Sequence, residues 1–221
     1  PLNYKKNLMS ARGMGKKPIF ITCKDEWDEA NDVTTKIQKS ISEKGANYSD
    51  NMVLCRSLYG LRTIESQCIS KKIPYIIYGG TSLMQSKHVR DVVSPMRIVA
   101  NYKDELAWMR YLLLWKGIGE VSASKIINNV IGEESLDDCL DKLSGCGLQE
   151  EISQTLKNIK EMQFSPSLAI SKTLETMENR LKELYKEEWS WRKQDFDILR
   201  EVAIGTNGIL EFVSEYVLDP K

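Results

Sequence analysis

The apolar pattern of the chain changes character at Gly79-Gly80, and this change constrains the fold more than any other feature. Before the two glycines, short apolar runs alternate with longer stretches whose apolar residues recur at three- and four-residue steps. The short runs are residues 18–23, 52–55 and 74–78, and the longer stretches are residues 25–44 and 58–70. The first kind of pattern is typical of strands and the second of helices. Their alternation favours parallel strands with helical crossovers, so we expect an α/β region with a partial parallel sheet.

After Gly80 the strand signal disappears and the pattern is helical to the end. The predicted helices are residues 87–99, 104–114, 122–130, 136–143, 149–162, 167–188, 195–203 and 209–217. Asn101-Tyr-Lys-Asp104 has the form of a helix end followed by a new N-cap. We therefore predict two domains, an α/β domain at residues 1–100 and an all-α domain at residues 101–221.

Composition excludes several classes of protein. Hydrophobic residues make up 42% of the 221 residues, enough for a buried core, and Lys+Arg equals Asp+Glu at 31 each, so net charge indicates no partner. Five cysteines without CxxC spacing and a single histidine argue against a disulfide scaffold and against a metal site. The thiols suggest a reducing, cytoplasmic compartment, and no apolar run approaches the ~20 residues of a membrane span.

A paired-glycine bend at Gly117-Ile-Gly119 lies between two predicted helices. Glycines allow a tight turn and close approach of another molecule, and the following helix start offers unpaired N–H groups with the positive end of the helix dipole. A DNA phosphate suits such a site, and it would be bound without reading sequence. The residues expected to contact DNA here are Lys116, Gly117, Ile118, Gly119, Ser122 and Lys125. The alternative is a tight interhelix turn without a ligand.

The order of short motifs from residue 52 to residue 125 resembles the UvrD/Rep/PcrA-like superfamily 1 DNA helicases. The motifs are Val53-Leu-Cys-Arg56, Arg62, Glu65, Ile73-Pro-Tyr75, Gly79-Gly80, Val89-Arg-Asp91, Met96-Arg-Ile98, Asp104 and Gly117-Ile-Gly119. The residues around 195–220 are also similar to that family, whereas residues 135–193 match only in being helical. The resemblance thus covers nearly the whole chain.

This resemblance implies a piece of a DNA helicase, with residues 1–100 as part of the second RecA-like (2A) domain and residues 101–221 as the helical 2B domain. The family moves 3′ to 5′ along single-stranded DNA with ATP and Mg²⁺, in repair or replication. The implied partners are DNA, as duplex and as a duplex–single-strand junction, and the other motor domains of the same protein. Further DNA-contacting candidates are Arg56, Gly79, Gly80, Lys87 and Arg90. Arg56 could instead form a local structural ion pair.

Other family features do not occur in the sequence. No GxxxxGK[ST] phosphate loop is present, since Gly13-Met-Gly-Lys-Lys17 has the wrong spacing, and no acidic box follows a buried strand. We therefore expect no catalytic residue, no cofactor and no ATPase activity in this polypeptide. After Gly80 the family tends to have a sequence like FFxRxEIKD, where this chain has Ser86 in place of the basic residue and His88 in place of the glutamate. His88 is expected to be a polar surface or interdomain residue rather than a catalytic base.

Two other functions remain open at this level. The chain could be a DNA-binding or scaffold module that is not part of a motor. It could also be the partner-binding insert of a helicase–nuclease of the AddA or RecB type.

Overall fold

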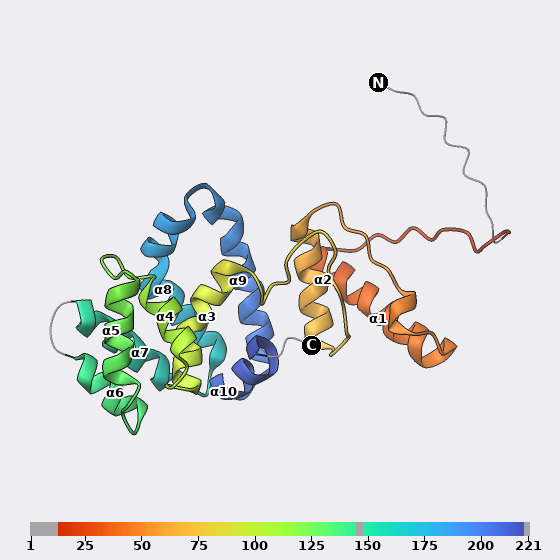
Figure 1. Ribbon diagram of the computed structural model, residues 1–221. Helices are drawn as coiled ribbons and strands as arrows, with labels where there is room; N and C mark the ends of the chain where they lie inside the picture. Colours follow the sequence, from red (N-terminus) through yellow and green to blue (C-terminus); the bar gives the residue numbers. More distant parts are fainter. Residues whose placement is uncertain (1–12, 145–147, 219–221) are drawn as a thin grey trace.

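The computed structural model describes residues 13–144 and 148–218, and within these ranges the chain consists of helices joined by turns and irregular segments (Figure 1). The α-helices are α1 (Glu26–Lys44), α2 (Leu58–Ser70), α3 (Lys87–Ala100), α4 (Glu105–Leu112), α5 (Glu120–Val130), α6 (Leu136–Leu143), α7 (Leu148–Glu161), α8 (Pro166–Tyr185), α9 (Trp189–Ile204) and α10 (Ile209–Phe212). The shorter helical segments are η1 (Tyr48–Asp50), η2 (Lys186–Glu188) and the π-helical η3 (Val213–Leu218). The helices predicted from periodicity are confirmed, with ends shifted by a few residues in most cases.

The expected partial parallel sheet is wrong. No residue of the described ranges 13–144 and 148–218 lies in a strand. The three apolar runs predicted as strands are irregular and for the most part solvent-exposed, as shown by Phe20 at 92%, Leu54 at 87% and Tyr78 at 86% exposure. A buried strand needs a hydrogen-bonding neighbour and an apolar cover on both faces. Here α1 and α2 pack against each other and leave most of these runs uncovered, with Tyr75 as an exception.

Local signals explain where α1 begins and ends. The Asp25 carboxylate accepts a hydrogen bond from the Asp28 amide at 2.8 Å, which satisfies one of the unpaired N–H groups of the first turn. Gly45 ends the helix with φ 63°, a left-handed conformation that favours glycine. Both ends are therefore determined by residues next to them in the sequence.

Most of the apolar core lies in the helical bundle, which we define as α3 to η3. Its largest fully buried side chains include Trp108, Tyr111, Phe196 and Phe212. Helix α3 occupies the middle, since it contacts α4, α7, α8, α9 and α10. Within the residues that the structure covers, no helix is long and apolar enough to cross a membrane.

Residues 13–81 form the N-terminal lobe, which contains α1, η1 and α2 and lies beside α9 (Figure 1). Its buried apolar cluster consists of Ala30, Ile64, Cys68 and Ile73. So small a cluster gives the lobe little independent stability, because burial of apolar surface is the main favourable term in folding.

The lobe and the bundle are connected by a buried polar joint made of Arg62, Glu65, His88 and Asp195. The Arg62 guanidinium on α2 donates to Glu65 at 2.7 Å and lies 3.4 Å from Asp195 on α9. It also donates to the Thr81 carbonyl and the Ser86 hydroxyl. One buried side chain thus links α2, the segment before α3, and α9.

His88 completes the polar joint from α3. Its Nδ1 lies 2.6 Å from a guanidinium nitrogen of Arg192, which can only donate, so Nδ1 accepts. The proton is therefore on Nε2, which donates to the Asp195 carboxylate at 2.9 Å. His88 is 1% exposed, so it is not a surface residue, and its hydrogen bonds join α3 to α9 within the bundle, next to Arg62 of the lobe.

Glu65 has a second role in the joint. Its carboxylate accepts hydrogen bonds from the Tyr75 hydroxyl at 2.9 Å and from the Leu83 amide at 2.7 Å. Burial and the neighbouring Glu65 carboxylate raise the pKa of Tyr75 well above its usual value, so the phenol remains a donor at neutral pH. These bonds fix the irregular segment that leads from α2 to α3.

Helix α3 contains Pro95 in its interior. Proline has no N–H, so the carbonyl of Asp91, four residues earlier, loses its usual partner. The Ser94 hydroxyl donates to that carbonyl at 2.6 Å. The Asp91 carboxylate binds Arg110 of α4 at 2.6 Å and the hydroxyl of Tyr185 of α8.

Candidate nucleic-acid interface

The paired-glycine bend connects α4 to α5. Gly117 has φ +92°, a conformation that L side chains rarely adopt. Gly119 is the N-cap of α5 with φ −97° and ψ 176°, and no side chain caps the helix there. Because the first N–H groups of a helix lack intrahelical partners, the start of α5 offers its amides to solvent or to a ligand.

The bend is accessible from outside. Gly117 and Gly119 are exposed, and a Cβ built on either would have no heavy atom within 4 Å. Ile118 is half-buried and packs against the large core cluster, as expected for the residue that anchors the turn. A molecule can therefore approach the backbone closely while Ile118 holds the bend in place.

The polar candidates around the bend are also exposed. Lys116, Ser122 and Lys125 lie at the surface beside the start of α5. Glu120 is exposed in the first turn of the same helix and places one carboxylate near these groups. With two lysines, one carboxylate and the positive end of the helix dipole, the balance of charge favours an anion.

The second group of candidates lies in the other half of the molecule. Gly79 is exposed with φ +82°, and Arg56, Lys87 and Arg90 are exposed as well. A Cβ at Gly80 would meet Leu58 Cδ2 at 2.8 Å, so this glycine also has a packing role. Figure 1 shows the bend between α4 and α5 at the end of the bundle away from α1 and α2, so the two groups do not form one site.

Arg90 lines a hollow of about 440 Å³. The hollow is lined by Thr81, Met84, Gln85, Arg90, Arg97 and Val217. Arg97 is already paired with Asp104 at 2.6 Å, whereas Arg90 makes no ion pair with the residues that the structure describes. Lys87 lies over the Tyr185 ring at 6.0 Å, so part of its interaction is with the protein itself.

No catalytic or metal centre is visible in the part of the chain that the structure covers. Within it, no group of three or more His, Cys, Asp and Glu side chains could hold a metal ion. The titratable residues that sequence reasoning did not bring together, Arg62, Glu65, His88 and Asp195, are engaged with one another and connect helices. His88 and Asp195 are 107 positions apart, so no local pattern indicates their contact.

Comparison with known proteins places the chain among helicases. Residues 2–207 match the UvrD-like helicase C-terminal domain. The ATP-dependent DNA helicase PcrA of Staphylococcus aureus is 29% identical over 159 residues, and that of Staphylococcus epidermidis is 30% identical over 159 residues. Each alignment covers 71% of this chain and 22% of the relative, so the chain spans less than a quarter of these proteins.

Proposed function

Because the chain belongs to the UvrD-like helicase C-terminal domain family, we propose that it is part of an ATP-dependent DNA helicase that moves 3′ to 5′, and that it contacts duplex DNA. Within that proposal, residues 101–221 belong to the helical 2B domain and residues 1–100 to part of the 2A domain. ATP and Mg²⁺ act in the whole protein, together with its other motor domains.

The uncapped start of α5 carries this proposal. A phosphate at Gly119 accepts hydrogen bonds from the first amides of α5, with Lys116 and Lys125 as additional cations and Ser122 as a donor. These contacts involve only the sugar–phosphate backbone, so binding is independent of base sequence. A helicase acts on duplex DNA next to a single strand. In this proposal the bend at Gly117 contacts the duplex part of that junction.

Gly119→Asp is the sharpest test of this site. The backbone of Gly119 suits any residue, and aspartate is a preferred N-cap, so the variant should fold with equal or slightly higher stability. The new carboxylate occupies the amides and repels phosphate. We expect affinity for a fluorescent duplex–single-strand junction, measured by anisotropy, to fall about tenfold or more.

Gly132→Asp is the matched control. Gly132 is exposed just beyond the other end of α5 and has no heavy atom within 4 Å of a built Cβ. It adds the same charge away from the proposed phosphate site, and it should leave affinity nearly unchanged. Equal binding by wild type and Gly119→Asp, with unfolding temperatures showing that both fold, would refute the interface.

Salt dependence tests the two lysines separately. Binding of wild type to the junction should weaken as salt rises, because phosphate contacts release counterions. Lys116→Gln and Lys125→Gln should each reduce the slope of log affinity against log salt by about 1. Unchanged slopes in both variants would remove these lysines from the interface.

The isolated 221-residue chain should not hydrolyse ATP, since its sequence holds no phosphate loop and no acidic box. The measurement is phosphate release with Mg²⁺ and single-stranded DNA, in a preparation purified to remove contaminating ATPases. Release that copurifies with the chain would contradict this part of the proposal.

A further inference from the structure

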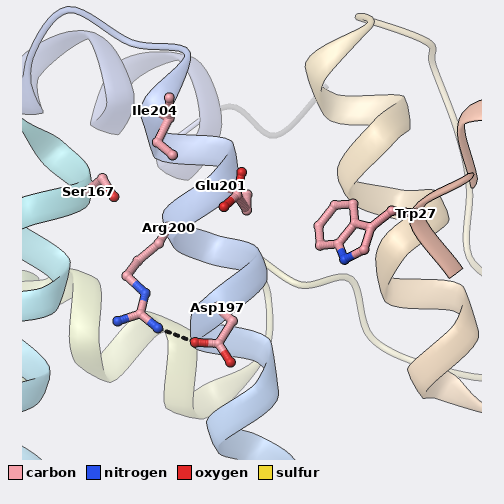
Figure 2. Close-up of a pocket in the computed structure, with 6 residues that line it drawn as sticks. All are labelled: Trp27, Ser167, Asp197, Arg200, Glu201 and Ile204. Atoms are coloured by element: carbon pink, nitrogen blue, oxygen red, sulfur yellow. Dashed lines mark hydrogen bonds and ion pairs between the residues drawn. The ribbon is translucent and has the colours of Figure 1, made fainter. Parts of the chain in front are cut away.

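A groove of about 690 Å³ separates the start of α1 from α9 and the start of α8. Its lining residues are Trp27, Ser167, Asp197, Arg200, Glu201 and Ile204. Figure 2 shows the Trp27 indole directed across the groove toward α9, where Glu201 projects toward it. The groove lies between the N-terminal lobe and the bundle and shares no residue with the bend at Gly117.

The walls of the groove carry exposed apolar surface. Trp27 is 39% exposed and Ile204 is 65% exposed, and Leu168, next to Ser167, is 59% exposed. Large apolar side chains gathered around a hollow are a common feature of protein interaction sites. The surface therefore suits a ligand that is partly apolar.

The charge of the groove is negative. Arg200 is paired with Asp197, so these two charges offset each other. Glu201 is exposed and has no ion pair in the described part of the chain. The first turn of α1 carries three more carboxylates close to Trp27 in the sequence, Glu26, Asp28 and Glu29, although none of them lines the groove itself. A ligand for this surface should be cationic, and phosphates of DNA would be repelled.

An indole and a carboxylate that line the same groove form a favourable environment for a cationic side chain. A guanidinium or ammonium group can lie on the indole, where the ring quadrupole attracts it, while the carboxylate pairs with its charge. We propose that this groove binds an arginine or lysine side chain of a partner protein, from a segment with aliphatic neighbours that cover Ile204 and Leu168. The partner is thus a basic, partly apolar peptide segment.

The test uses the blocked tripeptide acetyl-Leu-Arg-Leu-amide and the ¹⁵N-labelled 221-residue chain. Binding is followed by NMR at the Trp27 indole N–H, assigned from the spectrum of Trp27→Phe, and at the Glu201 amide. We expect saturable shifts of both signals. The same peptide with citrulline in place of arginine keeps the shape and loses the charge, and it should bind about fivefold more weakly.

Two variants separate the contributions of charge and ring. Glu201→Gln and Trp27→Leu should each weaken binding of the arginine peptide about threefold or more, with Trp27→Leu followed at the Glu201 amide. Glu187→Gln, an exposed carboxylate in η2, and Trp191→Phe, a 47% exposed indole elsewhere on α9, should leave it unchanged. Because all four residues lie at the surface, the variants should remain folded.

Three outcomes would overturn the proposal. The first is the absence of saturable shifts at millimolar peptide. The second is equal affinity for the arginine and citrulline peptides, or equal affinity of wild type and Glu201→Gln. The third is a shift of the same two signals by a single-stranded oligonucleotide, which would assign the groove to nucleic acid instead.

Discussion

The N-terminal lobe and the helical bundle differ in how much of their apolar surface is buried. In the bundle, large side chains such as Trp108 and Phe212 are fully buried among many helices. In the lobe, the buried cluster is limited to Ala30, Ile64, Cys68 and Ile73. A helix satisfies its backbone hydrogen bonds internally and needs cover on one face only, whereas a buried strand needs neighbours in the sheet and cover on two faces. The helices of the bundle therefore bury a large apolar core among themselves, whereas the apolar runs of the lobe stay mostly exposed.

The largest expected effect is in the bundle. Trp108→Ala removes a fully buried indole whose N–H donates to the Tyr102 carbonyl at 2.8 Å. We expect the free energy of unfolding to fall by about 4 kcal/mol, measured by urea denaturation. Ile76→Ala, at 77% exposure in the lobe, should change it by less than about 0.5 kcal/mol. Similar losses in the two variants would show that the lobe buries more than the structure indicates.

Arg62→Met tests whether the polar joint couples the two regions. The variant leaves the carboxylates of Glu65 and Asp195 buried without their cation, which should cost about 3 kcal/mol. Hydrogen exchange should increase most in α2 and at the start of α3. Arg90→Met, an exposed arginine, is the matched control and should exchange as wild type does. If hydrogen exchange increased in α5 to α7 as much as in α2, the joint would not act locally.

A smaller loss is expected from the apolar cluster of the lobe. Ile64→Ala should reduce stability by about 2 kcal/mol, the low end for such a change, because neighbouring Ile37 and Tyr75 are only partly buried and can adjust. Proteolysis should detect the loss as faster cleavage within residues 13–81. Cleavage that instead begins in α5 to α7 would contradict the separation of the two regions.

The reactivities of Cys55 and Cys68 can be compared in the wild-type protein, without a substitution that changes its stability. Burial raises the pKa of Cys68 to about 11, whereas Cys55 is exposed. At pH 8 only about one Cys68 thiol in a thousand is then ionised, so alkylation mapped by mass spectrometry should be faster at Cys55. A raised pKa also means that labelling of Cys68 should accelerate as pH rises from 8 toward 11. Equal labelling at pH 8 would show that the lobe opens readily.

Local patterns predicted the helices well, because their start and stop signals are adjacent in sequence. Asp25 and Gly45 illustrate this for α1, and the helices at residues 58–70 and 136–143 agree with α2 and α6. Strands depend on partners elsewhere, and short apolar runs do not show whether those partners are present. This is the physical reason why the sheet predicted before Asn101 was wrong.

The candidate site was predictable only in part. Paired glycines between helical patterns indicated a turn and its half-buried Ile118, but the roles of Gly117 in the bend and Gly119 as the N-cap depend on backbone angles. The contact of His88 with Asp195 required the folded chain, since these residues come from different helices. The assignment of Lys116 and Lys125 to DNA stays a prediction.

Pro95 removes one backbone hydrogen bond from α3, and the side chain of Ser94 supplies a donor in its place. The Ser94 hydroxyl replaces the lost backbone donor at the Asp91 carbonyl, and at the same residue the carboxylate ties α3 to α4 and α8. The Ser94 hydroxyl therefore keeps the Asp91 carbonyl hydrogen-bonded in the helix that contacts α4, α8 and α9, so one hydroxyl preserves the helix on which these three pack.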